Sequence, residues 1–302
     1  MRQDGRVDEQ LRVGLVGAGP WASMIHAPGL ANHPGTRLTG VWARRPEAAQ
    51  ELANAHGAEA FTSYRDLLST VDAVAFCVPP AVQGPMAIEA ANAGKHVVLE
   101  KPIAESQEVA EELVRAVTDA NVASLVVLTR RYAPETRELL KQLHRTGGWT
   151  GADGRWLTGA LLGGPFSNSP WRHERGALDD IGPHAFDLLD AALGEITDVI
   201  AAHVSETGLW QLILQHAGGA TSTLSLTMSL PLEPPFSDFT VFGPNGHRTL
   251  NSRDTSAVEC YTNLLDDFVA MVHSGTTTHE CDVRRGLHLQ KVIDLARRKA
   301  GV

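Results

Sequence analysis

The segment ALDDIGPHAFD, residues 177–187, sets a carboxylate and an imidazole four positions apart. Asp180 and His184 would project from the same side of one helical turn, because residues i and i+4 are neighbours on a helix. An imidazole takes or returns a proton near neutral pH, and a carboxylate beside it supports the cation that forms. The structural alternative is an aspartate that caps a helix, followed by a histidine in its first turn.

Gly182 and Pro183 separate these two side chains and indicate the local backbone. Glycine leaves room where ligands approach closely. Proline has no N–H group and fits a helix only in its first turn. The stretch therefore predicts a helix N-terminus, which also helps to keep Asp180 ionised.

A further candidate is Lys101 in HVVLEKPIA, residues 96–104, where an apolar run ends in glutamate, lysine and proline. Ligands of doubly wound sheets lie outside the carboxyl ends of the strands, so Lys101 should point into that crevice. Its ammonium group could donate to a substrate hydroxyl or carbonyl oxygen. Pro102 makes a cis peptide possible there. Without this position, a lysine in a loop is more often a surface residue.

The segment GLVGAGPWA, residues 14–22, has GxGxxA spacing between a predicted strand and a predicted helix. Gly17 permits a tight turn, Gly19 leaves room for a pyrophosphate, and Ala22 lets the helix sit close to the sheet. Pro20 suits the first helical position. A glycine-rich turn that binds nothing is the alternative, but the strand–helix alternations that follow favour dinucleotide binding.

The end of the second strand governs which nicotinamide cofactor fits, since an acid there bonds the ribose 2′-hydroxyl and repels a 2′-phosphate. Here the strand ends in VWARRP, with Ala43 in the place of the acid and Arg44 and Arg45 behind it. Guanidinium groups suit a phosphate. The sequence therefore favours NADP, while NAD stays possible if the two arginines are solvated surface.

These candidates need a sheet to position them, and the first part of the chain alternates short apolar runs with helix-like segments. Strands are expected at residues 11–17, 37–43, 60–61, 72–78, 96–100 and 123–129, and helices at 20–33, 46–57, 64–70, 82–94 and 106–120. The pattern predicts an α/β fold whose N-terminal domain, residues 1–129, is a Rossmann doubly wound parallel sheet that binds NAD(P).

Residues 130–302 have a different character and are expected to form a substrate-binding α+β domain with an open, mostly antiparallel sheet. Helices are expected at 134–147, 177–193, 262–275 and 283–300. The run LSLTMSL, residues 224–230, alternates apolar with Ser and Thr side chains, which is typical of a sheet with one wet face. That polar face either contacts solvent or pairs with a second copy in a homodimer.

Composition limits the function classes. The 302 residues are 43% hydrophobic and carry a net charge of −9, which suits a soluble two-domain protein and argues against a nucleic-acid partner. The polar start and the lack of a long apolar run predict a cytoplasmic protein without membrane contact. Three widely spaced cysteines offer neither a disulfide framework nor a CxxC site. The cluster HSGTTTHEC, residues 273–281, fits no helical ligand spacing, so no metal is expected.

Five motifs together resemble the glucose-fructose oxidoreductase and inositol dehydrogenase family of NAD(P)-dependent oxidoreductases. They are GLVGAGPWA, AGKHVVLEKPIA (93–104), TRRYAP (129–134), Trp171 with Arg172, and GALDDIGPHAFD (176–187). The resemblance covers nearly the whole chain. It implies that Lys101, Asp180 and His184 form a catalytic group beside the nicotinamide, with Trp171 and Arg172 as candidates for substrate contact. Trp171 and Arg172 could equally be a structural cation–π pair.

The implied reaction is hydride transfer between NADP and a sugar, cyclitol or related hydroxy or keto compound. In that reaction His184 exchanges the hydroxyl proton, Lys101 stabilises charge on the oxygen, and Asp180 orients the substrate and supports the histidinium. Reduction of a C=N bond, NAD-assisted glycoside hydrolysis, and a non-catalytic cofactor sensor or scaffold remain alternatives on the same fold. The residues expected at the cofactor are Gly17, Gly19, Pro20, Trp21, Ala22, Arg44, Arg45, Pro79 and Glu100.

The chain departs from the family pattern in two places. Many members place a histidine in the loop after the fourth strand, where this chain has Gln83 in VPPAVQG. The substrate-side loops between residues 147–156 and 164–176 also look short for the family. The first departure leaves the contacts of that histidine unassigned, and the second predicts a more open pocket or a lost oligomer interface.

Overall fold

The computed structural model describes residues 10–251 and 253–302, which form two compact units. Unit 1 holds residues 10–103, 111–127 and 257–284. Unit 2 holds residues 104–110, 128–256 without 252, and 285–302. Each unit contains one six-stranded sheet. No helix within the described ranges combines the length and apolar character that crossing a bilayer requires.

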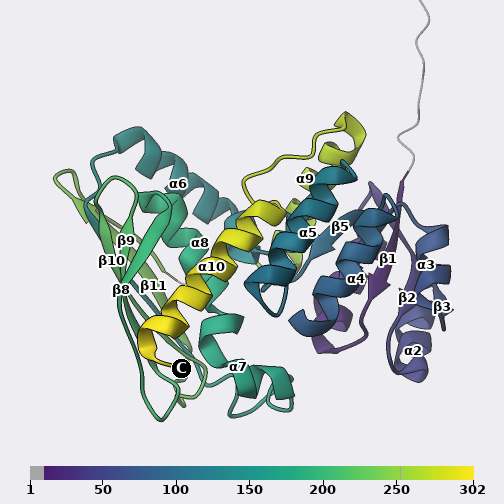
Figure 1. The fold of residues 1–302 in the computed structure, drawn as a ribbon, viewed down its shortest axis with the longest axis horizontal. Coiled ribbons are helices and arrows are strands. Elements are labelled where there is room, and N and C mark those ends of the chain that lie inside the picture. The colour runs from purple at the N-terminus through teal and green to yellow at the C-terminus, as the bar shows by residue number, and fades with distance from the viewer. Residues whose placement is uncertain (1–9, 252) are drawn as a thin grey trace, which may run out of the picture. The chain divides into compact units, whose positions relative to one another are not determined.

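Unit 1 is built on a parallel sheet whose strands lie in the order β3-β2-β1-β4-β5-β6 (Figure 1). The strands are β1 (Leu11–Val16), β2 (Thr36–Trp42), β3 (Glu59–Phe61), β4 (Ala73–Phe76), β5 (His96–Leu99) and β6 (Ser124–Val126). All four residues of β4 are fully buried, as expected for a central strand covered on both faces. This strand order is that of two mononucleotide-binding halves, so the predicted Rossmann sheet is confirmed.

The helices of this sheet follow the predicted alternation closely. They are α1 (Ala27–Asn32), α2 (Pro46–His56), α3 (Tyr64–Thr70), α4 (Pro80–Asn92) and α5 (Gln107–Asp119). The first differs from the expected helix over 20–33, because Ala22–His26 form a π-helical turn before α1. Pro28 has no N–H group to continue the ordinary ladder, and the N–H of Ala27 reaches back to the carbonyl of Ala22.

Helix α9 (Ala257–Ser274) also belongs to unit 1, although it follows the second sheet in the sequence. Its Tyr261 is fully buried and packs against His26, with ring centroids 4.6 Å apart. A Cβ added at Gly29 would meet the Tyr261 ring at 2.5 Å, so the glycine admits this close approach. The proposed division into residues 1–129 and 130–302 separates the two sheets, whereas the compact unit 1 also includes this later helix.

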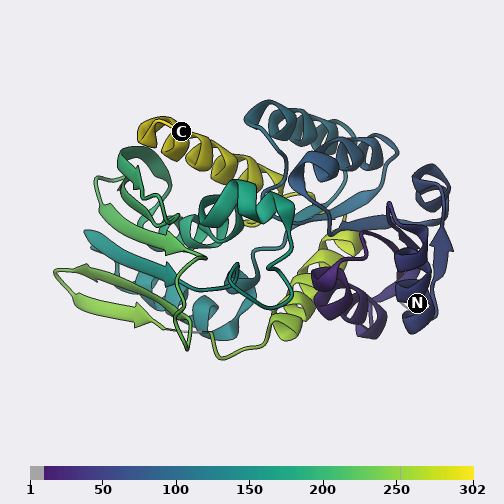
Figure 2. The ribbon, with the colours of Figure 1, turned by 90° about the horizontal axis from the view of Figure 1, so that it is seen from below.

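Unit 2 contains the sheet β12-β11-β7-β10-β9-β8, shown in green and teal after a quarter turn in Figure 2. Its strands are β7 (Gly151–Leu157), β8 (Ile196–Val204), β9 (Trp210–His216), β10 (Thr221–Thr227), β11 (Phe236–Gly243) and β12 (Gly246–Leu250). Only β7 and β10 pair in parallel, and the other neighbours in this sheet are antiparallel. The predicted mostly antiparallel sheet is therefore confirmed.

The expected alternation over residues 224–230 holds only in part. Leu224 and Leu226 are buried, but β10 ends at Thr227, which is itself buried, and Leu230 lies beyond the strand and is half-buried. This part of the chain also contains the helices α6 (Pro134–Thr146), α7 (Pro170–Asp180), α8 (Gly182–Leu193) and α10 (Val283–Ala300), and a 3-10 turn at Thr129–Tyr132.

Candidate active site

The glycine turn after β1 has the predicted strand–turn–helix form. Gly17 adopts a φ of 120°, which favours glycine, and its N–H donates to the carbonyl of Trp42 at 2.8 Å. A Cβ at this position would lie 2.2 Å from the carbonyl oxygen of Cys77. Only glycine therefore lets β1, β2 and β4 meet so closely at their carboxyl ends.

The space beside the second glycine of the turn is open. A Cβ at Gly19 would meet no atom within 4 Å, whereas Ala22 is fully buried beneath the turn. Pro20 is exposed at the first helical position, where its missing N–H costs nothing. The turn therefore has the shape that a dinucleotide pyrophosphate requires, with close backbone and no side chain in the way.

Arg44 and Arg45 are exposed in the short loop between β2 and α2. Ala43 occupies the position directly after β2, so no carboxylate stands there. Glu47 lies in the first turn of α2, where an acid suits the helix dipole. Both interpretations of the arginines, a site for a 2′-phosphate and solvated surface, are compatible with this placement.

Glu100 follows β5 and is held by side chains from two other elements. Its Oε1 accepts hydrogen bonds from Trp21 Nε1 at 2.8 Å and from His26 Nε2 at 2.9 Å. Because a carboxylate only accepts, His26 carries its proton on Nε2, and its Nδ1 accepts from the Tyr261 hydroxyl at 3.1 Å. Burial raises the pKa of Tyr261 well above its ordinary value, so the phenol keeps the proton it donates. The result is a chain of hydrogen bonds from Tyr261 through His26 to Glu100.

His26, Cys77 and Glu100 bring three ligand-type atoms within 4.8 Å of one another. Such a set resembles a zinc site in composition. Both ring nitrogens of His26 and Oε1 of Glu100 are, however, already engaged in the hydrogen-bond chain. We therefore assign this cluster to the support of Glu100. Sequence reasoning placed Glu100 and Trp21 near the cofactor but missed His26 and Tyr261, which lie 235 positions apart.

Lys101 is half-buried directly after Glu100, and its peptide bond to Pro102 is cis. Pro79, another predicted cofactor contact, precedes the first residue of α4 and is half-buried. The carboxyl ends of β1, β4 and β5 thus present the glycine turn, Pro79, Glu100 and Lys101 along one edge of the parallel sheet. This is the edge at which doubly wound sheets bind their ligands.

In unit 2, Asp180 and His184 lie on either side of a helix boundary. Helix α7 ends at Asp180, and α8 begins at Gly182 with Pro183 in its first turn, as the sequence predicted. The two side chains do not share one helical turn as expected, because Pro183 has no N–H group with which to continue α7. Both residues are buried, with relative exposures of 7% each.

Asp180 is paired with Arg172 rather than standing alone. Arg172 Nε donates to Asp180 Oδ2 at 2.9 Å, and its guanidinium lies 4.7 Å from the Trp171 ring and 4.8 Å from the Phe166 ring. The cation–π pair considered in the sequence analysis is therefore present. A guanidinium at this distance favours the ionised carboxylate.

His184 lies beside an aromatic ring that the sequence analysis did not select. The ring of Trp156 on β7 lies 5.8 Å from the His184 ring, measured between centroids. The Arg130 guanidinium lies 4.4 Å from the centroid of the same Trp156 ring. Arg130 Nη2 also donates to Ser237 Oγ at 2.6 Å. Arg130 lies within the TRRYAP motif, but nothing in the spacing of the sequence indicates that it meets Trp156.

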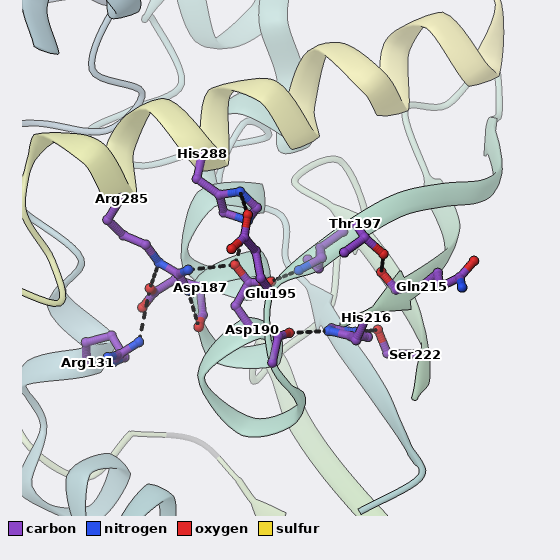
Figure 3. A network of polar contacts seen from close by, with 12 residues as sticks. Arg131, Asp187, Asp190, Glu195, Thr197, Gln215, His216, Ser222, Arg285 and His288 are labelled. Carbon is purple, nitrogen blue, oxygen red and sulfur yellow. Dashed lines mark hydrogen bonds and ion pairs between the residues drawn. The ribbon is translucent and has the colours of Figure 1, made fainter. Parts of the chain in front are cut away.

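Helix α8, which carries His184, is fixed by a buried ionic network (Figure 3). Asp187 Oδ1 accepts from Arg285 Nε at 2.7 Å and from Arg131 Nη1 at 3.1 Å. Asp190 Oδ2 lies 2.7 Å from Arg285 Nη1 and 2.7 Å from His288 Nε2. Because both aspartates have 1% side-chain exposure, the network ties α8 firmly to α10.

The predicted site residues thus fall into two groups. Unit 1 brings together the glycine turn, Trp21, Glu100 and Lys101, while unit 2 brings together Asp180, Arg172 and Trp171 and places His184 against Trp156. Lys101 belongs to unit 1 and the Asp180–His184 pair to unit 2, so their joint action stays a prediction. A parallel sheet of this strand order with this turn defines a dinucleotide-binding protein of the Rossmann class.

Comparison with known proteins places the chain more narrowly. Residues 11–128 match an oxidoreductase family with an NAD-binding Rossmann fold, the glucose-fructose oxidoreductase and inositol dehydrogenase group. Residues 11–128 belong to this family, and the resemblance drawn from the motifs is confirmed.

Individual proteins agree with this membership. The oxidoreductase YceM of Salmonella typhimurium is 31% identical over 220 residues, 72% of this chain and 60% of that protein. The NADP(+)-dependent scyllo-inositol 2-dehydrogenase IolU of Bacillus subtilis is 30% identical over 140 residues, 45% of this chain and 42% of that protein. The matched parts therefore span less than two thirds of either relative.

A solved structure, GenD2 from gentamicin A biosynthesis in complex with NAD, shows the same fold across both units. It superimposes with a TM-score of 0.86 at 22% sequence identity, and the match covers 100% of this chain and 97% of that one. This similarity supports the fold of the whole chain.

Proposed function

We propose that this protein is an NADP-dependent oxidoreductase that transfers hydride between nicotinamide and a sugar, a cyclitol or a related hydroxy or keto compound. The observation that carries the proposal is the edge of the parallel sheet in unit 1. There the open turn at Gly19 lies at the carboxyl end of β1, and the supported Glu100 and the half-buried Lys101 lie at the carboxyl end of β5, on the other side of β4. Family membership supplies the reaction class.

The bound cofactor would supply the hydride acceptor or donor, and the chain's own residues would bind and move the proton. In this proposal His184 takes the proton from the substrate hydroxyl through a ring nitrogen, or returns it. Lys101 donates to the same oxygen as negative charge develops on it. Asp180 supports the imidazolium, and Arg172 keeps Asp180 ionised through the 2.9 Å contact.

Two considerations support a sugar or cyclitol substrate and NADP. The relative IolU is named for scyllo-inositol and NADP(+). In this chain the position after β2 is Ala43, and exposed guanidinium groups follow it. A 2′-phosphate finds permanent positive charge and no carboxylate at this place. The NAD bound to GenD2 shows that the same fold also accepts the cofactor without that phosphate.

The test is turnover of scyllo-inositol, myo-inositol and D-glucose with NADP⁺ and with NAD⁺, followed by absorbance of the reduced cofactor. Lys101→Ala and His184→Ala should each lower kcat by about 100-fold or more, because each removes a group acting on the reacting oxygen. Affinity for NADPH, measured by quenching of tryptophan fluorescence, should stay close to wild type. Wild-type turnover in both variants would refute the catalytic roles, and failure to bind either cofactor would refute the function.

A further inference from the structure

The side chain of Gln83 stands at the point where α4 meets the end of β5. It lies in the first turn of α4 and is fully buried. Helix α4 starts at the carboxyl end of β4, and β4 pairs with β5, so the side chain reaches the residues that follow β5. Those residues, 100–103, include Lys101 and have no regular secondary structure.

The side-chain amide of Gln83 makes four contacts with the backbone of this segment. Its Oε1 accepts the N–H of Glu100 at 2.9 Å, and its Nε2 donates to the carbonyl of the same residue at 2.6 Å. Nε2 also lies 3.2 Å from the Pro102 carbonyl oxygen and 3.1 Å from that of Ile103. One side chain thus replaces the strand partner that Glu100 lacks and holds both sides of Lys101.

The chemistry of these contacts fixes which way the amide faces. Turning the group over would set its N–H groups against the N–H of Glu100 and its oxygen against three carbonyl oxygens. Glutamine suits these contacts because its side-chain amide carries one acceptor oxygen and two N–H donors on one planar group. Gln83 stands at the position where many family members have a histidine.

The side chain of Glu100 is held independently, by Trp21 and His26. The main chain and the side chain of the residue before Lys101 are therefore both anchored, and the carbonyls of the two residues after it are anchored as well. Such anchoring sets the direction in which Lys101 leaves the backbone. A reacting group must be held to within a fraction of an ångström, and a misplacement of about 1 Å can lower a rate by about 100-fold.

We propose that Gln83 is a positioning residue for Lys101, whose buried amide clamps residues 100–103 and so aims the lysine at the reacting oxygen. The kinetic part of this inference rests on the proposed function. The structural part, the clamp itself, does not.

The clamp is tested first without any substrate, by hydrogen exchange of the Glu100 amide. Gln83→Met keeps the length and apolar stem of the side chain and removes its polar group. The Glu100 amide should then exchange at least about tenfold faster than in wild type, because its acceptor is gone. The amide of Val98 inside β5 should exchange at the wild-type rate, which separates loss of the clamp from general destabilisation. Unchanged exchange at Glu100 would overturn the inference.

The link to Lys101 is tested by a double-mutant cycle on turnover of scyllo-inositol with NADP⁺. Gln83→Met should lower kcat by about 10- to 100-fold while both KM values change less than about threefold, because the substitution itself removes no group proposed to contact substrate or cofactor. In a Lys101→Ala background the same change should cost nothing further. An equal loss in both backgrounds would show that Gln83 acts elsewhere and would overturn the inference.

Two further variants and a control sharpen the result. Gln83→His keeps one donor and one acceptor and should recover part of the lost kcat, whereas Gln83→Glu turns a carboxylate toward the carbonyl oxygens and should lose the most. Gln50→Met, a matched change on the exposed face of α2, should behave as wild type. If Lys101→Ala alone leaves turnover unchanged, the proposed catalytic role of Lys101 is wrong. The hydrogen exchange of the Glu100 amide then tests by itself whether Gln83 holds residues 100–103.

Discussion

At the scale of single residues, the loop after β2 is the place where NADP, which carries a 2′-phosphate, would be distinguished from NAD, which does not. Arg44 and Arg45 are exposed beside Ala43, and a carboxylate at this place would bond a ribose hydroxyl and repel a phosphate. In the proposed function, the choice between NAD and NADP therefore depends on the charge of this loop and not on the glycine turn, which both cofactors would use.

Arg44→Asp should reverse the proposed preference for NADP. The substitution removes a guanidinium and adds a carboxylate, so Kd for NADPH should rise by about tenfold or more while Kd for NADH falls. Fluorescence titration with both reduced cofactors measures the two constants. Arg65→Asp, at another exposed arginine of the same unit, serves as the control. An NADPH affinity equal to wild type in Arg44→Asp would assign the arginines to the surface.

At the scale of elements, α8 depends on its buried ionic network. Asp187 has 1% side-chain exposure and contacts the guanidinium groups of Arg131 and Arg285, so its removal takes one carboxylate away from two largely buried cations, of which Arg285 keeps Asp190. Asp187→Ala should lower the free energy of unfolding by about 3–5 kcal/mol. Asp72→Ala removes the exposed partner of Arg12 and should cost less than about 1 kcal/mol. Urea unfolding of both variants measures the two free energies of unfolding. Similar decreases in the two variants would show that the buried network stabilises the fold no more than an exposed ion pair does.

Asp179, at the end of α7, gives the stability of the fold a pH dependence of defined sign. Burial raises its pKa from 3.8 to about 6, and the nearby Arg297 offsets only part of that effect. The folded state therefore keeps a proton that the unfolded chain has already lost. This group makes the free energy of unfolding fall as pH rises from about 4 to 6, by roughly 3 kcal/mol at most, and has little effect above that range.

Asp179→Asn should remove that slope. The free energy of unfolding of wild type minus that of the variant, measured in urea at intervals between pH 4 and pH 7, should decrease with rising pH and then level off. Asp119→Asn, an exposed position on α5, should run parallel to wild type. Parallel curves for Asp179→Asn as well would show that Asp179 has an ordinary pKa in the folded state.

At the scale of the whole molecule, the open face of the second sheet raises the question of a partner. Cross-strand register aligns Ala201, Ile213, Thr223, Asp153 and Thr240 on this face. Ile213 is 42% exposed among mostly polar neighbours. Such a face suits solvent or a second copy of the chain.

The predicted homodimer through this sheet should appear as twice the monomer mass in light scattering. Ile213→Asp should then convert it to a monomer, because like charges would face each other across a two-fold axis. Gln50→Asp on the exposed face of α2 should leave the mass unchanged. A wild-type mass equal to that of the monomer would contradict the predicted homodimer.

Much of this architecture could be predicted from sequence because it depends on local periodicity. The six parallel strands follow apolar runs, and the helix start at Gly182 follows from Pro183. Long-range pairings leave no such pattern. Nothing in the sequence joins Gln83 to the backbone of Glu100, or Tyr261 to His26, since these contacts depend on how distant segments meet. The expected helix over residues 20–33 also missed the π-helical turn at Ala22–His26, because the sequence pattern does not show how the backbone adjusts to Pro28.

The return of α9 to unit 1 bears on the order of events during synthesis. The chain leaves unit 1 after residue 127 and comes back only at residue 257. While the ribosome makes the residues between them, the nascent unit has its parallel strands but not Tyr261, so His26 Nδ1 lacks the hydroxyl that donates to it and Gly29 lacks its cover. Vectorial synthesis therefore supplies the Tyr261 end of the hydrogen-bond chain to Glu100 only after all strands of the second sheet have been made.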